Sequence, residues 1–323
     1  MLKTRVLPFE YQVFKKLSSL KADWSESRVL IALSGGRDSM ILLNVLQALQ
    51  SRLKFELVVA YVHHGKSSNQ SVTVYRRRAA AFVRKQAKDR NLKFELLTHS
   101  GAELKSEADF RKERERLLER CRKNLGCEFI AYGHHSDDLL ETRLIRLIRG
   151  TGAQGLQSMA LAHGHKLRPL LSFSSAELEK YSDHVKLKWV VDPTNEADHY
   201  FRNWIRNTWL PILELKRAGS KQALGRSLEQ IAETLSQQPQ SNSEMRLEVI
   251  KRKEFGDLNQ IEKREVVARL LLDRGARDFS RRQIDEILKR LSSLQATKRR
   301  NMTFEVAGLE WRVNAEQIEA VRL

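Results

Sequence analysis

A short segment between an expected strand and an expected helix constrains the fold of this chain more than any other feature. The apolar run 29–33 has the length and β-branched content of a buried strand, and residues 40–50 carry apolar side chains at helical spacing. Between them lies Ser34–Ser39, with the sequence SGGRDS. Its two glycines allow backbone angles and a close approach that a Cβ would block. Successive amide N–H groups and the positive end of the following helix would face an anion, so the segment predicts a phosphate cradle.

The ordinary alternative for SGGRDS is a Gly-Gly turn with a serine cap. It is not a Walker A loop, because no lysine follows its second glycine, and it lacks the third glycine of a dinucleotide fingerprint. Ser34 and Ser39 supply neutral donors, and Asp38 supplies a hard oxygen ligand for Mg²⁺. At every fixed position the segment resembles SGGxDS, the signature of the PP-loop ATP pyrophosphatases. That resemblance implies cleavage of ATP between its α and β phosphates.

Composition narrows the class of protein. No apolar stretch approaches the length of a membrane span, and Met1–Leu20 is too charged for a secretory signal, so a cytoplasmic protein without a membrane partner is expected. With only Cys121 and Cys127, a disulfide framework is not expected. The net charge of +18 and the pI near 10 favour a polyanionic partner, most often nucleic acid. Residues 1–219 carry 38 basic and 24 acidic side chains, so the nucleic acid is expected to lie across this part.

Strand and helix patterns alternate through the first part of the chain. Strands are expected at residues 29–33, 55–62, 93–98 and 129–132, and helices at 40–50, 72–91, 107–124 and 137–149. This alternation predicts an α/β fold with a Rossmann-like doubly wound parallel sheet and helices on both faces. Ligands of such sheets bind beyond the carboxyl ends of the strands, so Ser34, His63 and Gly133 are expected to line one crevice.

A second domain is expected after the first, which spans residues 1–215. Gly219 and Ser220 break the pattern, and residues 220–323 then predict a mostly helical domain. Its helices are expected near 221–235, 258–273 and 281–291, and two short strands at 302–306 and 309–313. Lys298–Arg300 is either a phosphate contact or a solvated basic turn.

The longest informative stretch is Gly133–Thr142, with the sequence GHHSDDLLET. Asp138 and Glu141 are three residues apart on an expected helix and therefore share a face near its start. Carboxylates there suit the helix dipole, and Ser136 or Asp137 could cap the first turn, which is the ordinary explanation. Converging carboxylates beside a strand end could instead hold Mg²⁺ or an ammonium group.

This stretch resembles the second signature of the tRNA(Ile)-lysidine synthetases, a family within the PP-loop group. The resemblance covers roughly residues 28–215 in ordered blocks. Besides the two motifs above, these are Val62–Asn69, the helix with Glu107, Arg111 and Arg114, and the block from Asp192–Asn195 through Arg202, Arg206 and Pro211. The chain departs from the family pattern at His63, Lys66 and Glu115.

The family resemblance implies that lysidine is made on the wobble cytidine of a tRNA(Ile) with a CAU anticodon. ATP adenylates the C2 oxygen of the base and releases pyrophosphate, and the amine of L-lysine then attacks C2 and expels AMP. The implied catalytic residues are Asp38, Asp138, Glu141 and Arg114. The implied ATP-binding residues are Ser34, Gly35, Gly36, Arg37, Asp38, Ser39, His64 and His134, with Mg²⁺ on Asp38. The implied lysine- or tRNA-binding residues are Asp137, Asp138, Glu141, Arg111, Arg202 and Arg206.

Three other functions remain as alternatives. A tRNA thiolation enzyme of the same PP-loop fold is the closest, but such enzymes usually need paired cysteines, often as C-x-x-C, and Cys121 and Cys127 are six residues apart. A non-catalytic RNA-binding protein would not need Asp38, Asp138 and Glu141. An amide ligase for a small metabolite would explain the motif but not the positive charge.

Overall fold

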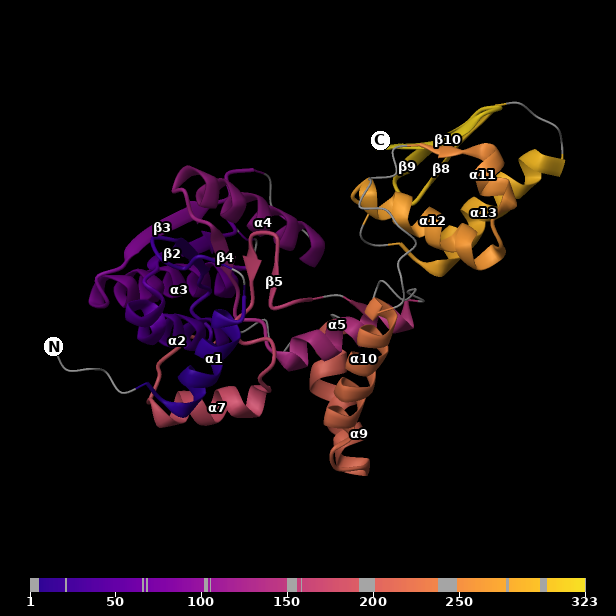
Figure 1. Cartoon of the computed structure of the whole chain (residues 1–323). Coiled ribbons are helices and arrows are strands. Elements are labelled where there is room, and N and C mark those ends of the chain that lie inside the picture. The colour runs from indigo at the N-terminus through magenta and orange to yellow at the C-terminus, as the bar shows by residue number, and fades with distance from the viewer. Residues whose placement is uncertain are drawn as a thin grey trace. The chain divides into compact units, whose positions relative to one another are not determined.

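A computed structural model gives the fold of the chain (Figure 1). It describes residues 6–20, 22–65, 67, 69–101, 104, 106–149, 156–157, 159–191, 201–237, 249–276, 279–296 and 301–322. The chain forms two compact units, Met1–Thr142 with Ser158–Arg226 and Arg143–Gln157 with Ser227–Leu323. This division differs from the expected domains, 1–215 and 220–323, at residues 143–157 and 220–226, so the domain boundaries stay a prediction.

The first unit is built on a six-stranded sheet with the order β3-β2-β1-β4-β6-β5 (Figure 1). The strands are β1 (Arg28–Ala32), β2 (Glu56–His63), β3 (Lys93–Thr98), β4 (Phe129–Ala131), β5 (Ala162–His163) and β6 (Lys166–Leu167). All neighbours pair in parallel except β5 and β6, which form an antiparallel hairpin. From β1 the chain winds outward to β3 and then returns to β4 on the other side. The expected doubly wound α/β fold is therefore confirmed.

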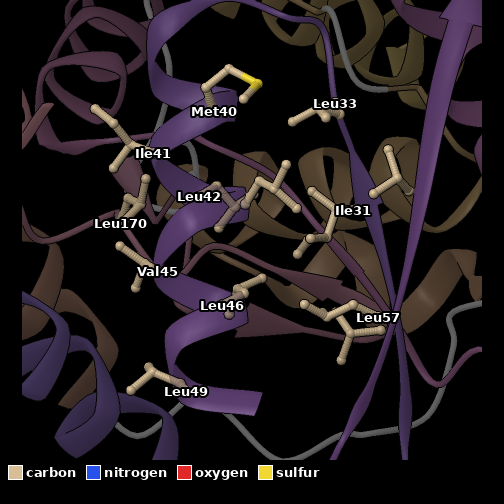
Figure 2. Close-up of a cluster of buried hydrophobic side chains, with 14 of the residues drawn as sticks. Ile31, Leu33, Met40, Ile41, Leu42, Val45, Leu46, Leu49, Leu57 and Leu170 are labelled. Atoms are coloured by element: carbon tan, nitrogen blue, oxygen red, sulfur yellow. The ribbon is translucent and has the colours of Figure 1, made fainter. Parts of the chain in front are cut away.

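Helices cover both faces of this sheet, because successive side chains of its buried strands point to opposite sides. On β1, Val29 and Ile31 pack in one cluster and Leu30 in another. The first cluster joins β1 to helices α1, α2, α3 and α7, and Figure 2 shows Ile31 facing the apolar side of α2. The second cluster joins Leu30 to Leu118 on α4. Apolar residues on both sides of each central strand thus hold the sheet between two layers.

A helix follows each of the strands β1, β2, β3, β4 and β6 in the first unit. The helices are α1 (Pro8–Ser18), α2 (Arg37–Leu53), α3 (Gln70–Asp89), α4 (Glu107–Asn124), α5 (Ser136–Ile148), α7 (Ser175–His184), α8 (Phe201–Trp204), the π-helical turn η2 (Ile205–Trp209), α9 (Leu210–Lys216) and α10 (Ser220–Gln237). Helices α5 and α10 contribute residues to both units. Helix α2 begins at Arg37 and not at Met40, so the expectation for its start was wrong by three residues.

The second unit combines helices with a four-stranded antiparallel sheet of order β7-β10-β9-β8. Its further elements are β7 (Ile250–Lys251), α11 (Arg252–Asp257), α12 (Gln260–Asp273), α13 (Arg281–Ala296), β8 (Met302–Val306), β9 (Leu309–Val313) and β10 (Gln317–Arg322). Trp311 of β9 is fully buried among apolar side chains of α12, α13 and the sheet. Strands β8 and β9 have the expected bounds, whereas β7 and β10 were not expected. In the part of the chain described, no helix combines the length and the apolar character that a membrane crossing needs.

Candidate active site at the carboxyl ends of the strands

The SGGRDS segment forms a self-braced loop between β1 and α2. Ser34 Oγ accepts a hydrogen bond from the Gly36 amide (3.3 Å) and lies 3.1 Å from Ser39 Oγ, which donates to the Gly36 carbonyl at 2.8 Å. Gly35 has a φ of +87°, which favours glycine. No described side chain caps α2, which begins directly after Gly36. The first-turn amides are therefore available to an anion, as the sequence predicted.

Gly133, just beyond β4, lies against the start of α2. A Cβ at this position would be 3.0 Å from the carbonyl carbon and oxygen of Asp38 and 3.2 Å from the Ser39 nitrogen. Only glycine allows that approach. Ser34, His63 and Gly133 follow β1, β2 and β4, which are neighbours in the sheet, and the strand order reverses between β1 and β4. The crevice that they are expected to line stays a prediction.

His135 links two carboxylates beside these strand ends. Its Nε2 lies 3.6 Å from Asp38 Oδ2 and 3.5 Å from Asp138 Oδ2, and its backbone amide donates to Asp138 Oδ2 at 3.1 Å. Burial lowers the pKa of His135, but the hydrogen bond to Asp38 and the charges of Asp138 and Asp38 outweigh burial and raise it. Burial raises the pKa of Asp38, but His135 and Arg37 outweigh burial and lower it. Asp38 is therefore ionised. The sequence interpretation selected His134 and missed His135, although adjacent side chains in an extended segment face opposite ways.

Asp138 and Glu141 share one face of α5, as their spacing predicted, and that face meets two arginines from a distant segment. Arg206 donates to Glu141 Oε1 (2.7 Å), Glu141 Oε2 (2.8 Å) and Asp138 Oδ1 (2.8 Å). Arg202 donates to Glu141 Oε2 at 3.1 Å and to Thr142 Oγ1 at 2.6 Å. The Glu141 side chain is 1% exposed, whereas that of Arg206 is 44% exposed. Glu141 is therefore fully engaged in holding the arginines, and Arg206 keeps an open side.

A local irregularity lies on the helix that carries these two arginines. Arg202 lies on α8 and Arg206 on the π-helical turn η2. This turn leads directly into α9, whose second residue is Pro211. Such turns have one extra residue within a helix and are frequent at functional sites. Both arginines reach Glu141, about sixty residues earlier in the chain.

Asp137 faces another cation. Its Oδ2 contacts the ammonium group of Lys221 at the start of α10, and its side chain is 11% exposed. Glu214 orients that end of α10 by accepting hydrogen bonds from the Gly219 and Lys221 amides at 2.7 and 2.9 Å. A lysine ammonium thus already lies beside one carboxylate of the Asp137-Asp138 pair.

The remaining expected site residues lie on the α4 side of the strand ends. His64 and His134 are neutral near pH 7. Burial first, and then the charges of Arg76 and Arg114, lower the pKa of His64 to about 4. Burial first, with Arg114 adding to it and Asp138 opposing, lowers the pKa of His134 to about 3. Arg114 is half-buried on α4 and Arg111 is exposed there. Arg111 lies 3.6 Å from Glu115, one of the positions that depart from the family pattern.

Other expectations fall outside the described residues. These are Lys66, Asp192–Asn195 and Lys298–Arg300. The side chain of Glu107 is likewise not described. The two cysteines are described and buried, as free thiols.

Comparisons with known proteins agree on one family. The model of the PP-loop domain matches residues 9–213. A tRNA(Ile)-lysidine synthase of Bdellovibrio bacteriovorus is 42% identical over 317 residues, which cover 96% of each chain. The tRNA(Ile)-lysidine synthase of Thermosipho africanus is 35% identical over 214 residues, 64% of this chain and 48% of that one. The chain therefore spans nearly all of the first relative and about half of the second.

A solved structure shares the fold. A U34-tRNA thiolase of Methanococcus maripaludis with its 4Fe–4S cluster superposes with a TM-score of 0.55 at 18% identity, over 72% of this chain and 80% of that one. At this level of identity the likeness shows the fold alone.

Proposed function

This chain belongs to the tRNA(Ile)-lysidine synthases of the PP-loop family, and we propose that it joins free L-lysine to C2 of the wobble cytidine, position 34, of the tRNA(Ile) with a CAU anticodon. The product, lysidine, would change codon recognition from AUG to AUA. The observation that carries the proposal is that the loop expected to bind phosphate lies close to carboxylates that could bind an ammonium group. Asp38 of the loop Ser34–Ser39 and Asp138 of α5 lie on either side of His135 Nε2, at 3.6 and 3.5 Å.

The loop supplies the chemistry of ATP activation. Amides at the start of α2 would hold ATP phosphates, and Ser34 and Ser39 fix the shape of the loop. The C2 oxygen of cytidine attacks the α phosphorus of ATP, and pyrophosphate leaves. Adenylation turns a poor oxygen leaving group into a good one, so the lysine amine can add to C2 and AMP can depart. Fixed donors aimed at the developing charge stabilise such steps.

We propose Asp38 as the residue that would hold a magnesium ion, and Asp138 lies across His135 from it. Asp38 and Asp138 each direct an oxygen at His135 Nε2, and Asp38 is ionised. Mg²⁺ in proteins is usually held by one or two carboxylates together with substrate phosphates. When bound, the ion would offset phosphate charge.

We assign the lysine ammonium to the carboxylates at the start of α5. Asp137 already accepts an ammonium group, that of Lys221, which shows that its surroundings suit such a head group. Asp138 is 14% exposed and contacts Arg206 through one oxygen. Glu141 acts through Arg202 and Arg206, which leaves the open side of Arg206 for a substrate anion. Arg111 and Arg114 extend the positive surface toward the RNA.

Lysine-dependent formation of AMP with total tRNA tests the proposed reaction. We expect AMP only when ATP, lysine and tRNA are all present, and loss of lysine dependence would contradict the proposal. Asp138→Asn should reduce lysine incorporation ten- to a hundredfold while pyrophosphate release continues in a single turnover, because a charge-assisted contact contributes about 1.5–3 kcal/mol. Asp89→Asn is a matched control, since Asp89 is exposed and forms an ion pair with Lys85 on the surface of α3.

The outcome for Asp138→Asn also separates the roles of this carboxylate. Equal loss of pyrophosphate release and lysine incorporation would assign it to Mg²⁺, and no loss would return it to capping of the helix start. Glu141→Gln serves as the comparison. A positioning role predicts a loss in both steps, because Arg202 and Arg206 would both be released.

Thiolation is not favoured. Cys121 and Cys127 are buried in one apolar cluster around the end of α4, as free thiols, and burial raises the pKa values of both, that of Cys121 to about 11. Thiols kept protonated are poor sulfur carriers or metal ligands.

A further inference from the structure

Three side chains beyond the ends of β4 and β6 bury polar atoms that have no hydrogen-bond partner among the described residues. They are the Tyr132 hydroxyl, His134 Nδ1 and Arg168 Nε. Native proteins rarely leave such atoms unpaired, because each one costs about 1–3 kcal/mol when it is removed from water without a partner. Unpaired buried atoms that gather in one place indicate a missing ligand.

The three residues lie at the same edge of the sheet. Tyr132 follows β4 and Arg168 follows β6, and these neighbouring strands remain joined there because the Tyr132 amide donates to the Leu167 carbonyl at 2.9 Å. The rings of Tyr132 and His134 are 5.6 Å apart and nearly parallel, at 19°. Arg168 is 8% exposed, and its Nη1 donates to the Ala160 carbonyl at 3.0 Å.

Charges of both signs act on Arg168 from α4. Burial is the largest influence on the pKa of Arg168 and lowers it, while Arg111 also lowers it and Glu115 raises it. Lys166 lies two residues before Arg168. The acidic Glu115 contacts Lys166 at 3.1 Å and Arg111 at 3.6 Å. Within the described ranges, no carboxylate is within ion-pair distance of Arg168. A buried guanidinium is unfavourable without an anion.

We propose that Arg168 and Tyr132, together with Arg114, form a subsite for a phosphate group of the RNA backbone beside the reacting nucleotide. The inference rests on the proposed tRNA substrate. A guanidinium group offers a phosphate two parallel donors, and a tyrosine hydroxyl adds a neutral one. Burial raises the pKa of Tyr132 to about 12, so the hydroxyl keeps its proton and can donate.

The position of the subsite favours the RNA over ATP as the source of the phosphate. The loop Ser34–Ser39 lies on the side of His135, since its Asp38 is 3.6 Å from His135 Nε2. His134 stacks on Tyr132, which packs with Leu118 of α4, whereas the apolar side of α2 packs in the cluster on the opposite face of the sheet. The subsite therefore lies apart from the loop that would hold the phosphates of ATP. Most hydrogen bonds in protein–nucleic acid complexes are made to phosphate and sugar, and they fix the position of the substrate.

The test compares tRNA binding with the use of the two small substrates. Equilibrium dissociation constants are measured by filter binding of a tRNA(Ile) transcript with a CAU anticodon, at several salt concentrations. The variants are Arg168→Met, Arg168→Lys and Tyr132→Phe, and the control is Arg120→Met, which removes an exposed arginine of α4. KM values for ATP and lysine are measured in parallel, with melting temperatures to confirm the fold.

We expect Arg168→Met to weaken tRNA binding ten- to a hundredfold and to reduce the slope of log K against log salt by about one. Arg168→Lys keeps the charge and the fold but loses the paired donors, so binding should weaken by a smaller factor at the same salt slope. Tyr132→Phe should weaken binding about two- to tenfold. KM for ATP and lysine should not change.

Several results would overturn the inference. A raised KM for ATP with unchanged tRNA binding would assign the anion to ATP, and a raised KM for lysine alone would assign it to the lysine carboxylate. Unchanged binding in Arg168→Lys and Tyr132→Phe would make the cluster structural. The proposed function and the subsite can be refuted separately. Absence of lysidine formation by the wild type would contradict the proposed function, whereas the tRNA dissociation constants, which are measured without ligation, would still decide the subsite.

Discussion

Replacing Gly133 by alanine should damage both the stability and the catalysis of this enzyme, through a single steric conflict. The added Cβ would lie 3.0 Å from the carbonyl carbon and oxygen of Asp38 and 3.2 Å from the nitrogen of Ser39. Favourable carbon contacts lie at about 3.5–4.0 Å, so the two segments must separate by roughly 0.5 Å. All three atoms belong to the backbone at the start of α2 and cannot rotate away.

The expected magnitudes follow from that displacement. Overpacking of this kind typically costs about 1–3 kcal/mol. In a domain of about 200 residues, 1 kcal/mol shifts the melting temperature by about 2–4 °C, so Gly133→Ala should melt about 2–12 °C below the wild type. The same displacement moves Asp38 away from His135 and distorts the anion-binding loop. Since a misplacement of about 1 Å can cost a hundredfold in rate, kcat/KM for ATP should fall ten- to a hundredfold at temperatures where the protein is still folded.

Two other glycines provide controls for this measurement. A Cβ on Gly225 in α10 meets no atom within 4 Å, so Gly225→Ala should leave activity unchanged and raise stability by up to about 1 kcal/mol. A Cβ on Gly36 meets only Ser34 Oγ, at an ordinary 3.5 Å, so Gly36→Ala should keep the melting temperature and lose ATP affinity. Calorimetry and pyrophosphate release would measure both properties. A wild-type melting temperature and a wild-type KM for ATP in Gly133→Ala would refute the reasoning.

Three further predictions concern other parts of the first unit. Asp38→Asn should abolish AMP formation while tRNA binding survives, because loss of a hard ligand removes several kcal/mol of charge stabilisation; wild-type turnover would contradict the magnesium assignment. Glu113→Gln should lower the free energy of unfolding by about 0.5–1 kcal/mol at pH 7, because its arginine partner is largely exposed to solvent. The hydrogen bond from Arg116 lowers the pKa of Glu113 to about 2, with help from His99 and against the effect of burial. The contribution of Glu113 to stability is therefore complete above about pH 4.5 and disappears as the pH falls toward 2. In urea unfolding, the difference in stability between wild type and Glu113→Gln should be smaller at pH 3 than at pH 7. Replacing Cys121 and Cys127 together by alanine should leave lysine-dependent AMP formation intact, and loss of that activity in a folded double variant would reopen a sulfur-transfer mechanism.

The regular elements of the first unit were largely predictable from the sequence because their signals are local. An apolar run followed by SGGRDS predicts a strand, an anion-binding loop and a helix from nearest neighbours alone, and β1 and α2 occupy those positions. The β5–β6 hairpin was missed because strands of two residues have no periodicity to detect. Helix α2 starts earlier than expected because its first turn is polar and carries no apolar signal.

The partners of the site residues depended on the tertiary structure. Helical spacing alone places Asp138 and Glu141 on one face, since residues three apart on a helix are neighbours. Nothing in that spacing indicates that Glu141 would hold Arg202 and Arg206, or that His135 would join Asp138 to Asp38. Those contacts depend on the order of the strands and on the packing of segments far apart in the sequence. The sequence by itself therefore determined the family, the anion-binding loop and the acidic face of α5, because each is encoded within about ten neighbouring residues. Only the tertiary structure decided which charges meet, because strand pairing brings distant residues together. One example is Arg168 beside Tyr132, where the Arg168 Nε has no hydrogen-bond partner among the described residues.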